Sequence, residues 1–245
     1  MIQPDLSGRT ALVTGSASGI GRSFLLALAE RGADVAVHYN TSDEAAREVA
    51  ATARESGVAA TAVGGDVTDP DAVDEVFSAV EADLGSVDVL VNNVGRFAPS
   101  HWADIDWEAW NGVLETNFNG TVLCSKRALG PMREAGWGRI VNVGYASAEK
   151  GLVSPKNFPY FVAKAGVLMF TRMLAADTQD DGVTVNALSP YVVENSDEFP
   201  EDAPRGRWAT YADLHQALLF FCDEGSEYVS GENVEVDGGW LPESV

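Results

Sequence analysis

Hydrophobic and polar positions follow two different periods along the chain. Short runs rich in Val, Ile, Leu and Thr alternate with longer segments whose apolar residues recur at helical spacing, which are the patterns of buried strands and amphipathic helices. The first strand is predicted over residues 10–14 and the first helix over 20–31. Further strands are predicted at 34–39, 60–67, 87–93, 139–144, 183–189 and 232–239, and helices at 43–56, 71–84, 106–134, 161–178 and 211–222.

This order of elements predicts an α/β fold. Strands separated by helices of this length pair in parallel through right-handed crossovers. The strand runs are almost continuously apolar, which is typical of strands covered on both faces. We therefore expect residues 1–245 to form a single Rossmann-type domain, a doubly wound parallel sheet with helices on both faces. Such sheets bind their ligands at the carboxyl ends of the strands.

The charge balance narrows the classes of partner. There are 37 acidic and 16 basic residues, a net charge of −21, and so acidic a surface repels nucleic acid and anionic membranes. The excess is spread along the chain, which favours adaptation to a salt-rich cytoplasm over an ordinary acidic enzyme. No apolar run has the length of a membrane span, and the first ten residues lack the apolar core of a signal peptide. We expect a cytoplasmic protein.

The cysteines and histidines do not indicate a metal site. Cys124 and Cys222 both fall in apolar helical patterns, so we expect two buried free thiols and no disulfide. The three histidines are scattered and show no metal-ligand spacing.

A glycine-rich stretch, "TGSASGIG", joins the first predicted strand to the first helix. Gly15 suits the tight turn, Gly19 lets the backbone approach a diphosphate, and Gly21 lets the helix pack on the sheet. The helix N-terminus offers free N–H groups to phosphates, and Ser16 and Ser18 add hydroxyl donors. No P-loop lysine follows, so the stretch favours dinucleotide binding over nucleotide triphosphate hydrolysis.

A second stretch, "YFVAK", places Tyr160 and Lys164 four residues apart at the start of a predicted helix, and therefore on one face. A tyrosine is a poor acid or base at neutral pH, because its ordinary pKa is about 10. A nearby ammonium favours the phenolate and lowers that pKa. We expect the pair to act as a general acid for a carbonyl or as a base for an alcohol.

Other motifs occur in a fixed order around these two. They are "GDVTD" (65–69), "NNVG" (92–95), "ETNFNG" (115–120) and "VDGG" (236–239). With these motifs, the chain resembles the short-chain dehydrogenase/reductase family of the Tyr-x-x-x-Lys type, most closely its 3-oxoacyl-carrier-protein reductase-like members. The resemblance covers essentially the whole length. It implies an oxidoreductase that transfers a hydride between NAD(P)(H) and a small carbonyl or alcohol substrate.

The resemblance also assigns roles to residues. Tyr160 would be the general acid or base, Lys164 would tune it and hold the nicotinamide ribose, and Asn117 would hold a water of the proton relay. The cofactor would be bound by Gly15, Ser16, Ser18, Gly19, Ile20, Gly21, Tyr39, Asn40, Asp66, Val67, Asn92, Gly95, Tyr160, Lys164, Pro190 and Val193, with Asp66 facing the adenine amino group.

The sequence departs from the family at the serine that binds the substrate oxygen. Tyr145 occupies that position after the fifth strand, and Ser147 lies two residues further on, thirteen before Tyr160. Ser147 could serve as the donor, Tyr145 could donate its own hydroxyl, or the donor could be missing. We favour Ser147 as the catalytic serine. Loss of one donor to a developing oxyanion costs roughly a hundred- to a thousand-fold in rate.

Two further departures lie after the sixth strand. Tyr191 replaces the glycine of the family's Pro-Gly, and Asn195 replaces a threonine that contacts the cofactor amide. The substrate lid, near residues 192–208, is short and acidic. A short lid implies an open pocket or a small substrate, and an acidic one disfavours an acidic carrier protein.

The end of the second strand bears on the choice of cofactor. Tyr39 stands where NAD-specific members carry an acid, and no acid occurs before Asp43, which favours NADP. Ser18 stands where an arginine often clamps the 2′-phosphate, so Arg22 or His38 would have to help. We predict NADP in preference to NAD.

Two functions from different classes remain. The first is an NADP-linked carbonyl reductase; the second is a catalytically impaired nucleotide-binding member of the same fold with a binding or regulatory role. The intact Tyr160, Lys164 and Asn117 favour the enzyme, whereas Tyr145 and Tyr191 favour the alternative. The family usually assembles as tetramers through its two long helices, so the resemblance implies a homo-oligomer, a dimer or a tetramer, through 106–134 and 161–178.

Overall fold

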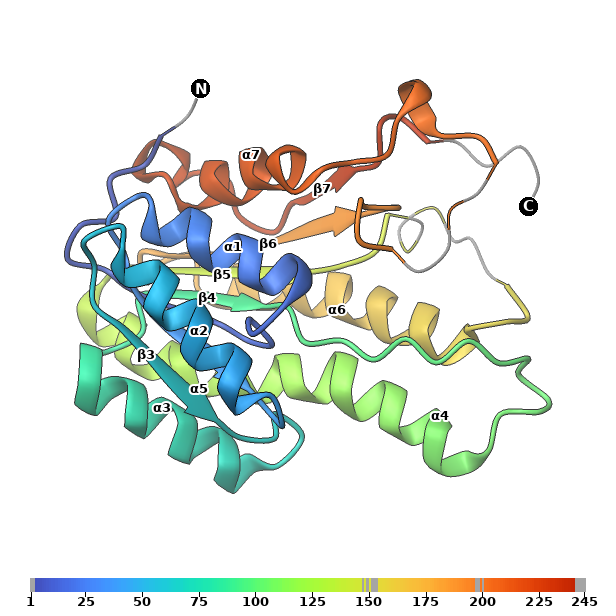
Figure 1. Cartoon of the computed structure of the whole chain (residues 1–245), viewed down its shortest axis with the longest axis horizontal. Helices are drawn as coiled ribbons and strands as arrows, with labels where there is room; N and C mark the ends of the chain where they lie inside the picture. The colour runs from blue at the N-terminus through green and yellow to red at the C-terminus, as the bar shows by residue number, and fades with distance from the viewer. Residues whose placement is uncertain are drawn as a thin grey trace.

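The sheet has seven strands, all parallel, as the alternation of elements predicts. The computed structural model describes residues 3–146, 148, 150, 154–196, 199 and 201–240. The strand order is β3-β2-β1-β4-β5-β6-β7 (Figure 1). The strands are β1 (Thr10–Val13), β2 (Asp34–Tyr39), β3 (Ala60–Gly64), β4 (Val89–Asn92), β5 (Gly138–Val143), β6 (Val183–Pro190) and β7 (Asn233–Val236).

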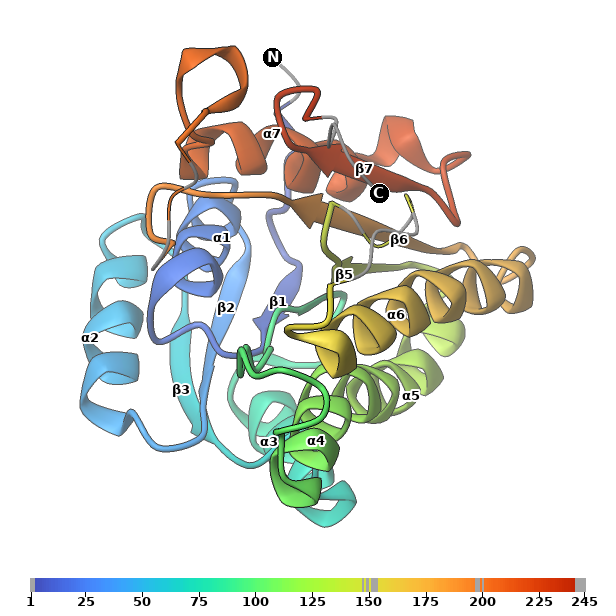
Figure 2. The ribbon, with the colours of Figure 1, turned by 90° about the vertical axis from the view of Figure 1, so that its right-hand side faces the viewer.

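Helices cover both faces of this sheet. The α-helices are α1 (Gly19–Ala29), α2 (Asp43–Arg54), α3 (Pro70–Leu84), α4 (Trp107–Leu114), α5 (Gly120–Ala135), α6 (Phe158–Asp177) and α7 (Tyr211–Cys222). A π-helical turn η1 (Glu115–Asn119) joins α4 to α5, and two 3₁₀ turns are η2 (Pro204–Gly206) and η3 (Glu224–Ser226). Helices α1, α2 and α7 lie on one face, and α3, α4, α5 and α6 on the other (Figure 2). The predicted doubly wound α/β fold is confirmed.

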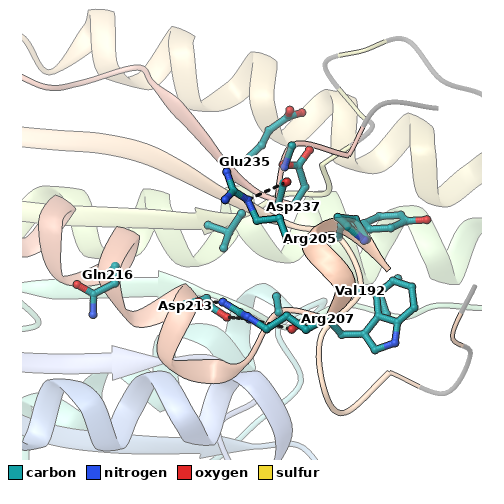
Figure 3. Close-up of a pocket in the computed structure, with 14 residues that line it drawn as sticks. Val192, Arg205, Arg207, Asp213, Gln216, Glu235 and Asp237 are labelled. Carbon is teal, nitrogen blue, oxygen red and sulfur yellow. Dashed lines mark hydrogen bonds and ion pairs between the residues drawn. The ribbon is translucent and has the colours of Figure 1, made fainter. Parts of the chain in front are cut away.

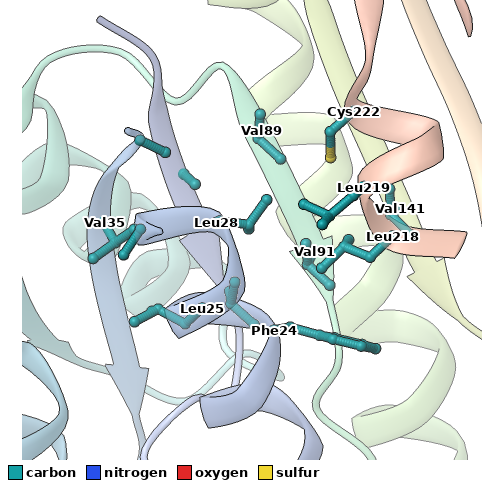
Figure 4. Close-up of a cluster of buried hydrophobic side chains, with 14 of the residues drawn as sticks. Phe24, Leu25, Leu28, Val35, Val89, Val91, Val141, Leu218, Leu219 and Cys222 are labelled. Carbon is teal, nitrogen blue, oxygen red and sulfur yellow. The ribbon is translucent and has the colours of Figure 1, made fainter. Parts of the chain in front are cut away.

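Each face of the sheet buries its own apolar cluster. On the α1 side, Phe24, Leu25 and Leu28 pack with β-strand residues such as Val91 and with Leu218 of α7 (Figure 4). The other cluster joins α3, α5 and α6 to the opposite side of the same strands. Because both faces are covered by apolar side chains, the sheet is rigid and holds the carboxyl ends of its strands in fixed positions.

The two cysteines are free and buried, as predicted. Burial raises the pKa of the Cys124 thiol, and likewise of the Cys222 thiol, to about 12. Among the described residues, no helix is long and apolar enough to cross a membrane, and no group of His, Cys, Asp or Glu could hold a metal ion.

Several predicted boundaries are wrong, and the last strand, for example, ends at Val236 rather than at residue 239. Residues 106–134 are two α-helices separated by η1 rather than one helix, because a π turn inserts an extra residue and turns Asn117 into the interior. The third strand ends at Gly64, before the loop that carries Asp66. Helix α6 begins at Phe158 rather than at residue 161, after Asn157 in the left-handed region (φ 66°). This early start puts Tyr160 inside the first turn.

Candidate active site

The loop between β1 and α1 is shaped by its glycines. Gly15 and Gly19 have φ of 64° and 57°, which side chains rarely adopt. A Cβ on Gly21 would lie 2.4 Å from the Gly15 carbonyl oxygen and 2.5 Å from Asn93 Nδ2. Helix α1 then begins at Gly19, after the exposed Ser18, whose side chain makes no capping hydrogen bond. The predicted turn at Gly15, the close packing at Gly21 and a helix N-terminus without a side-chain cap are present, and the approach of Gly19 to a diphosphate stays a prediction.

Two polar side chains that the sequence did not single out as anchors hold this loop. Asn93 Nδ2 donates to the Thr14 carbonyl oxygen at 2.9 Å, and Thr14 Oγ1 accepts from the backbone N–H of Asn93 at 2.9 Å. The neighbouring Asn92 turns the other way and donates to Ser125 Oγ and Asn142 Oδ1 in the core. Of "NNVG", therefore, the second asparagine supports the glycine loop, whereas the side chain of Asn92 points away from any cofactor.

Ser16 and His38 tie the loop to β2. The Ser16 side chain is fully buried, and its Oγ accepts from the His38 N–H at 3.0 Å, so the hydroxyl is committed to the scaffold. His38 Nδ1 accepts from the Gly15 N–H at 3.0 Å, and Nε2 lies 3.1 Å from the Gly65 carbonyl oxygen. This pairing assigns the proton to Nε2. Burial lowers the pKa of His38 to about 4. A neutral imidazole whose two nitrogens are both hydrogen-bonded cannot bind a phosphate.

Arg22, the other cation expected to help, lies toward α7, close enough for its charge to act on the Tyr211 phenol. It is not among the residues lining the groove described next. His38 therefore serves the scaffold as a neutral residue, and a role for Arg22 in holding the 2′-phosphate stays a prediction.

A groove of about 500 Å³ lies at the carboxyl ends of β1 to β4. This edge of the sheet faces the viewer in Figure 2. Six predicted cofactor residues line it: Gly15, Ser18, Tyr39, Asn40, Asp66 and Val67. Asp66 Oδ1 accepts from the backbone and hydroxyl of Thr68, which lowers its pKa and keeps it ionised. Arg96 also lines the groove, a residue that the motifs did not single out.

The end of β2 carries a small polar cluster at the mouth of this groove. A hydrogen bond between Tyr39 and Asp43 raises the pKa of the phenol and lowers that of the carboxyl. Arg47 Nε lies 2.9 Å from the same Asp43 carboxylate. An acid is thus close to Tyr39 after all, but it is paired with a cation one turn along α2.

Tyr160 and Lys164 lie together at the start of α6, on one face as predicted. Lys164 is 3% exposed, its Nζ donates to the Val143 carbonyl oxygen at 2.7 Å, and it lies 5.6 Å from the centre of the Tyr160 ring. Burial lowers the pKa of Lys164 to about 8. The pKa of Tyr160 is raised, first by burial and then by Tyr145, so the expected lowering by Lys164 does not dominate in this arrangement.

Asn117 reaches the same place from η1. Its Nδ2 donates to the carbonyl oxygens of Arg96 and Val113, both at 2.9 Å. Its Oδ1 is buried without a hydrogen-bond partner among the described residues, and such an atom calls for a water or a ligand. A Cβ on Gly95 would lie 2.8 Å from this Oδ1 and 3.6 Å from Lys164 Nζ. Gly95 therefore leaves open the space between the amide and the ammonium.

After β5 and β6, the structure describes most of the residues at which the sequence departs from the family. Tyr145 packs edge-on against Tyr160, with ring centres 5.7 Å apart, whereas Ser147 lies outside the described residues. Tyr191 stacks on Trp240 at 4.0 Å, so it fills the place of a glycine with an aromatic contact. Asn195 Nδ2 would lie 3.3 Å from a Cβ on Gly19, which brings the lid base to the phosphate loop.

The remaining predicted cofactor residues are Pro190 and Val193 on the lid side and Ile20 in α1. Pro190 ends β6, and Val193, 2% exposed, bridges to Ala209 at the base of the lid. Ile20 lies in the first turn of α1 and is partly buried against the core.

A second cavity, of about 490 Å³, lies between the lid, α7 and β7 (Figure 3). Its cations are held by neighbouring groups: Arg207 pairs with both oxygens of Asp213 at 2.6 and 2.9 Å, and Arg205 Nε donates to the Gly238 carbonyl oxygen. Lys150 pairs with Glu235 and Asp237, both at 2.7 Å. These contacts tie the acidic lid to α7 and to the end of the chain.

Comparison with known proteins identifies the family of the chain. A family model described as "Enoyl-(Acyl carrier protein) reductase" matches residues 15–241. The chain is 33% identical, over 94% of its length and 97% of the relative's, to the 3-oxoacyl-[acyl-carrier-protein] reductase FabG of Staphylococcus aureus. It is 37% identical to cis-4-hydroxycyclohexanecarboxylate dehydrogenase of Sinomonas cyclohexanicum, over 95% and 96%.

A solved structure shares the fold at similar coverage. Gluconate 5-dehydrogenase of Burkholderia cenocepacia, crystallised with NADP and tartrate, superposes with a TM-score of 0.90 at 29% identity, covering 97% of each chain. The chain therefore belongs to the short-chain dehydrogenase/reductase family, and it is a 3-oxoacyl-carrier-protein reductase-like oxidoreductase.

Proposed function

We propose that the protein transfers a hydride between NADP(H) and a carbonyl or secondary alcohol carbon, with Tyr160 as the general acid or base. The observation that carries this proposal is the meeting of Tyr160, Lys164, Asn117 and Gly95 beside the groove that begins at the glycine loop. A nicotinamide, when bound, supplies or accepts the hydride, and the chain supplies placement, protons and charge.

The residues present fit such a cofactor. Gly19 carries no side chain over the α1 N-terminus, and an added Cβ on Gly95 would close the space in front of Asn117. The N–H groups of that helix end suit a diphosphate, and no acidic residue lies in its first turn to repel one.

The ionisation of the site supports work as an acid. Because burial raises the pKa of Tyr160, the phenol stays protonated at neutral pH and has a proton to donate to a carbonyl oxygen. Lys164, held by Val143, places positive charge beside the phenolate that results. The buried Asn117 Oδ1 can accept from a water that returns the proton.

Three features support NADP(H). The related gluconate 5-dehydrogenase was crystallised with NADP. The Tyr39 side chain, rather than a carboxylate, ends β2. Asp43 is neutralised by Arg47, which also supplies a cation near the expected ribose.

The test follows NADPH oxidation with a panel of ketones by the wild type and by Tyr160→Phe. General acid catalysis is worth typically a hundred- to ten-thousand-fold, so Tyr160→Phe should lose at least a hundred-fold in kcat while keeping its affinity for NADPH. Unchanged turnover in Tyr160→Phe would refute the role of the phenol. No observation on the described residues favours the alternative of a non-catalytic member, whose signature would be NADPH binding without turnover of any substrate.

We propose that copies of the chain associate through α5 and α6. Met169 and Met173 of α6 are 70% and 54% exposed, and Val162 is 43% exposed, an unusual concentration of apolar surface on a chain of net charge −21. Light scattering after size exclusion should show a dimer or tetramer that Met169→Lys dissociates. A wild-type monomer at micromolar concentration would refute this.

A further inference from the structure

Three aromatic rings surround Tyr160. Phe97, from the loop after β4, packs edge-on against it with ring centres 5.2 Å apart and an interplanar angle of 85°. Tyr145, after β5, packs edge-on from another segment at 5.7 Å and 72°. Phe161 is the third ring, 6.5 Å away. The phenol that we assign as proton donor is thus enclosed by apolar ring surface.

Phe97 is open to solvent although it touches Tyr160. It is 57% exposed, so a large part of its ring has no protein partner. An exposed aromatic ring beside a reacting group is the kind of surface that a ligand covers. Covering it removes apolar area from water and adds a ring contact, both of which favour binding.

Backbone pairing fixes the loop that carries this ring. His101 bridges to Lys156, the Trp102 N–H donates to the Pro155 carbonyl oxygen at 2.8 Å, and the Asn157 N–H donates to Ser100. Asn157 in turn accepts from the Tyr160 N–H at 3.0 Å. These hydrogen bonds hold the loop against the first turn of α6. The contact of Phe97 with Tyr160 is therefore fixed by the backbone.

Two charged side chains lie near Phe97, and each is directed toward another element. Arg96, next to Phe97, extends to α4, where its Nη1 would lie 2.7 Å from a Cβ on Gly112. Lys164 Nζ is bonded to the Val143 carbonyl oxygen. The stretch from Phe97 to Ser100, "FAPS", carries no ionisable side chain.

We propose that Phe97 and Tyr145 form the walls of the substrate site and select a ring-bearing, uncharged ketone or secondary alcohol, whose ring packs against Phe97 while its oxygen faces Tyr160. This inference rests on the proposed function. Aromatic walls favour a compact apolar ring over a flexible chain or a carboxylate, because the chain must be ordered on binding and the carboxylate must lose its hydration.

The experiment compares three ketones, cyclohexanone, 2-hexanone and 4-oxopentanoate, with NADPH as reductant. The proteins are the wild type, Phe97→Ala, Phe97→Leu and the matched control Tyr228→Ala. Tyr228, between η3 and β7, is also an exposed aromatic residue, at 100%. For the wild type we expect kcat/KM for cyclohexanone at least tenfold above both acyclic ketones.

Phe97→Ala should lower kcat/KM for cyclohexanone at least tenfold, mainly through KM, and change 2-hexanone by no more than about threefold; contacts of this size are worth roughly ten- to two-hundred-fold. Phe97→Leu should fall between, and Tyr228→Ala should match the wild type. A preference for 4-oxopentanoate, or an equal loss on all three ketones in Phe97→Ala, would overturn the proposal while leaving the proposed reaction intact.

A binding measurement separates this inference from the reaction itself. Saturation-transfer NMR of cyclohexanol with NADP⁺-supplemented protein should show a signal that Phe97→Ala loses and Tyr228→Ala keeps. If no ketone is turned over, the proposed function fails, but this pattern still supports the aromatic site. A signal of equal strength in Phe97→Ala overturns it.

Discussion

Replacement of Lys164 with methionine should stabilise the protein at neutral pH although it removes a residue of the site. Lys164 is 3% exposed, and burial lowers its pKa from 10.5 to about 8. A base whose pKa is lower in the folded than in the unfolded state binds fewer protons when folded. Its burial therefore costs stability below pH 8, and the cost is relieved as pH rises from about 8 to 10.5.

The magnitude follows from the pKa values. A drop from 10.5 to about 8 corresponds to a cost of about 3 kcal/mol at pH 7. Methionine is similar in size and uncharged, so it removes that cost, but it leaves the Val143 carbonyl oxygen without its 2.7 Å hydrogen bond. That loss is worth about 1 kcal/mol. We expect Lys164→Met to be about 2 kcal/mol more stable than the wild type at pH 7.

Urea unfolding of both proteins at pH 7.0 and pH 9.5, at equal protein concentration, measures the difference. All other titrating groups are common to the two proteins and cancel in it. The advantage of Lys164→Met should shrink by about 2 kcal/mol between the two pH values, close to zero. If the variant is less stable at pH 7, or if the difference does not depend on pH, Lys164 is not held in the desolvated state described here.

Three further predictions concern the cofactor loop and its surroundings. Gly21→Ala places a Cβ 2.4 Å from the Gly15 carbonyl oxygen, so it should lower the free energy of unfolding by about 1–3 kcal/mol and weaken NADPH binding in calorimetry. Gly130→Ala on α5, where a Cβ meets nothing within 4 Å, should instead raise the free energy of unfolding by about 1 kcal/mol. Equal effects of the two variants would contradict the loop geometry. Burial lowers the pKa of His38 from 6.5 to about 4, so between these pH values the folded protein binds fewer protons than the unfolded chain. The free energy of unfolding should therefore fall by about 2 kcal/mol from pH 7 to 5. The fall should be smaller in His38→Gln, and an identical fall would argue against a buried neutral imidazole. Arg47→Ala should raise the Kd of NADPH severalfold and leave that of NADH unchanged, and a parallel loss for both would remove Arg47 from cofactor selection.

The donor to the substrate oxygen can be assigned by two variants. If Tyr145 donates, Tyr145→Phe should lower kcat by roughly a hundred- to a thousand-fold and Ser147→Ala should leave it near the wild-type value. The reverse pattern would assign the role to Ser147, as the spacing in the sequence favours.

The sequence predicts the parts of this molecule that depend on local pattern. Alternating strand and helix periods predict the parallel sheet, and the glycines at 15, 19 and 21 predict a turn that the structure contains. Tyr160 and Lys164 share a helix face because their spacing is one turn. Each of these conclusions needs only residues close together in the chain.

What the sequence does not predict depends on contacts between distant segments. His38 can be seen as a bridge only once the Gly15 N–H and the Gly65 carbonyl are brought to its two nitrogens. Asn92 and Asn93 are adjacent and identical, yet one points into the core and the other holds the glycine loop. The pKa of Tyr160 rises because burial outweighs its cationic neighbour, and burial is a property of the whole fold.

The central claim is that the glycine loop and the Tyr160 phenol address the two ends of one bound dinucleotide. A crystal structure with NADPH tests it most directly. The account predicts diphosphate oxygens at hydrogen-bond distance from the backbone N–H groups that begin α1, with the nicotinamide ribose at Lys164 and the nicotinamide within reach of the Tyr160 hydroxyl. NADPH bound elsewhere, or a nicotinamide out of reach of the Tyr160 hydroxyl, would contradict it.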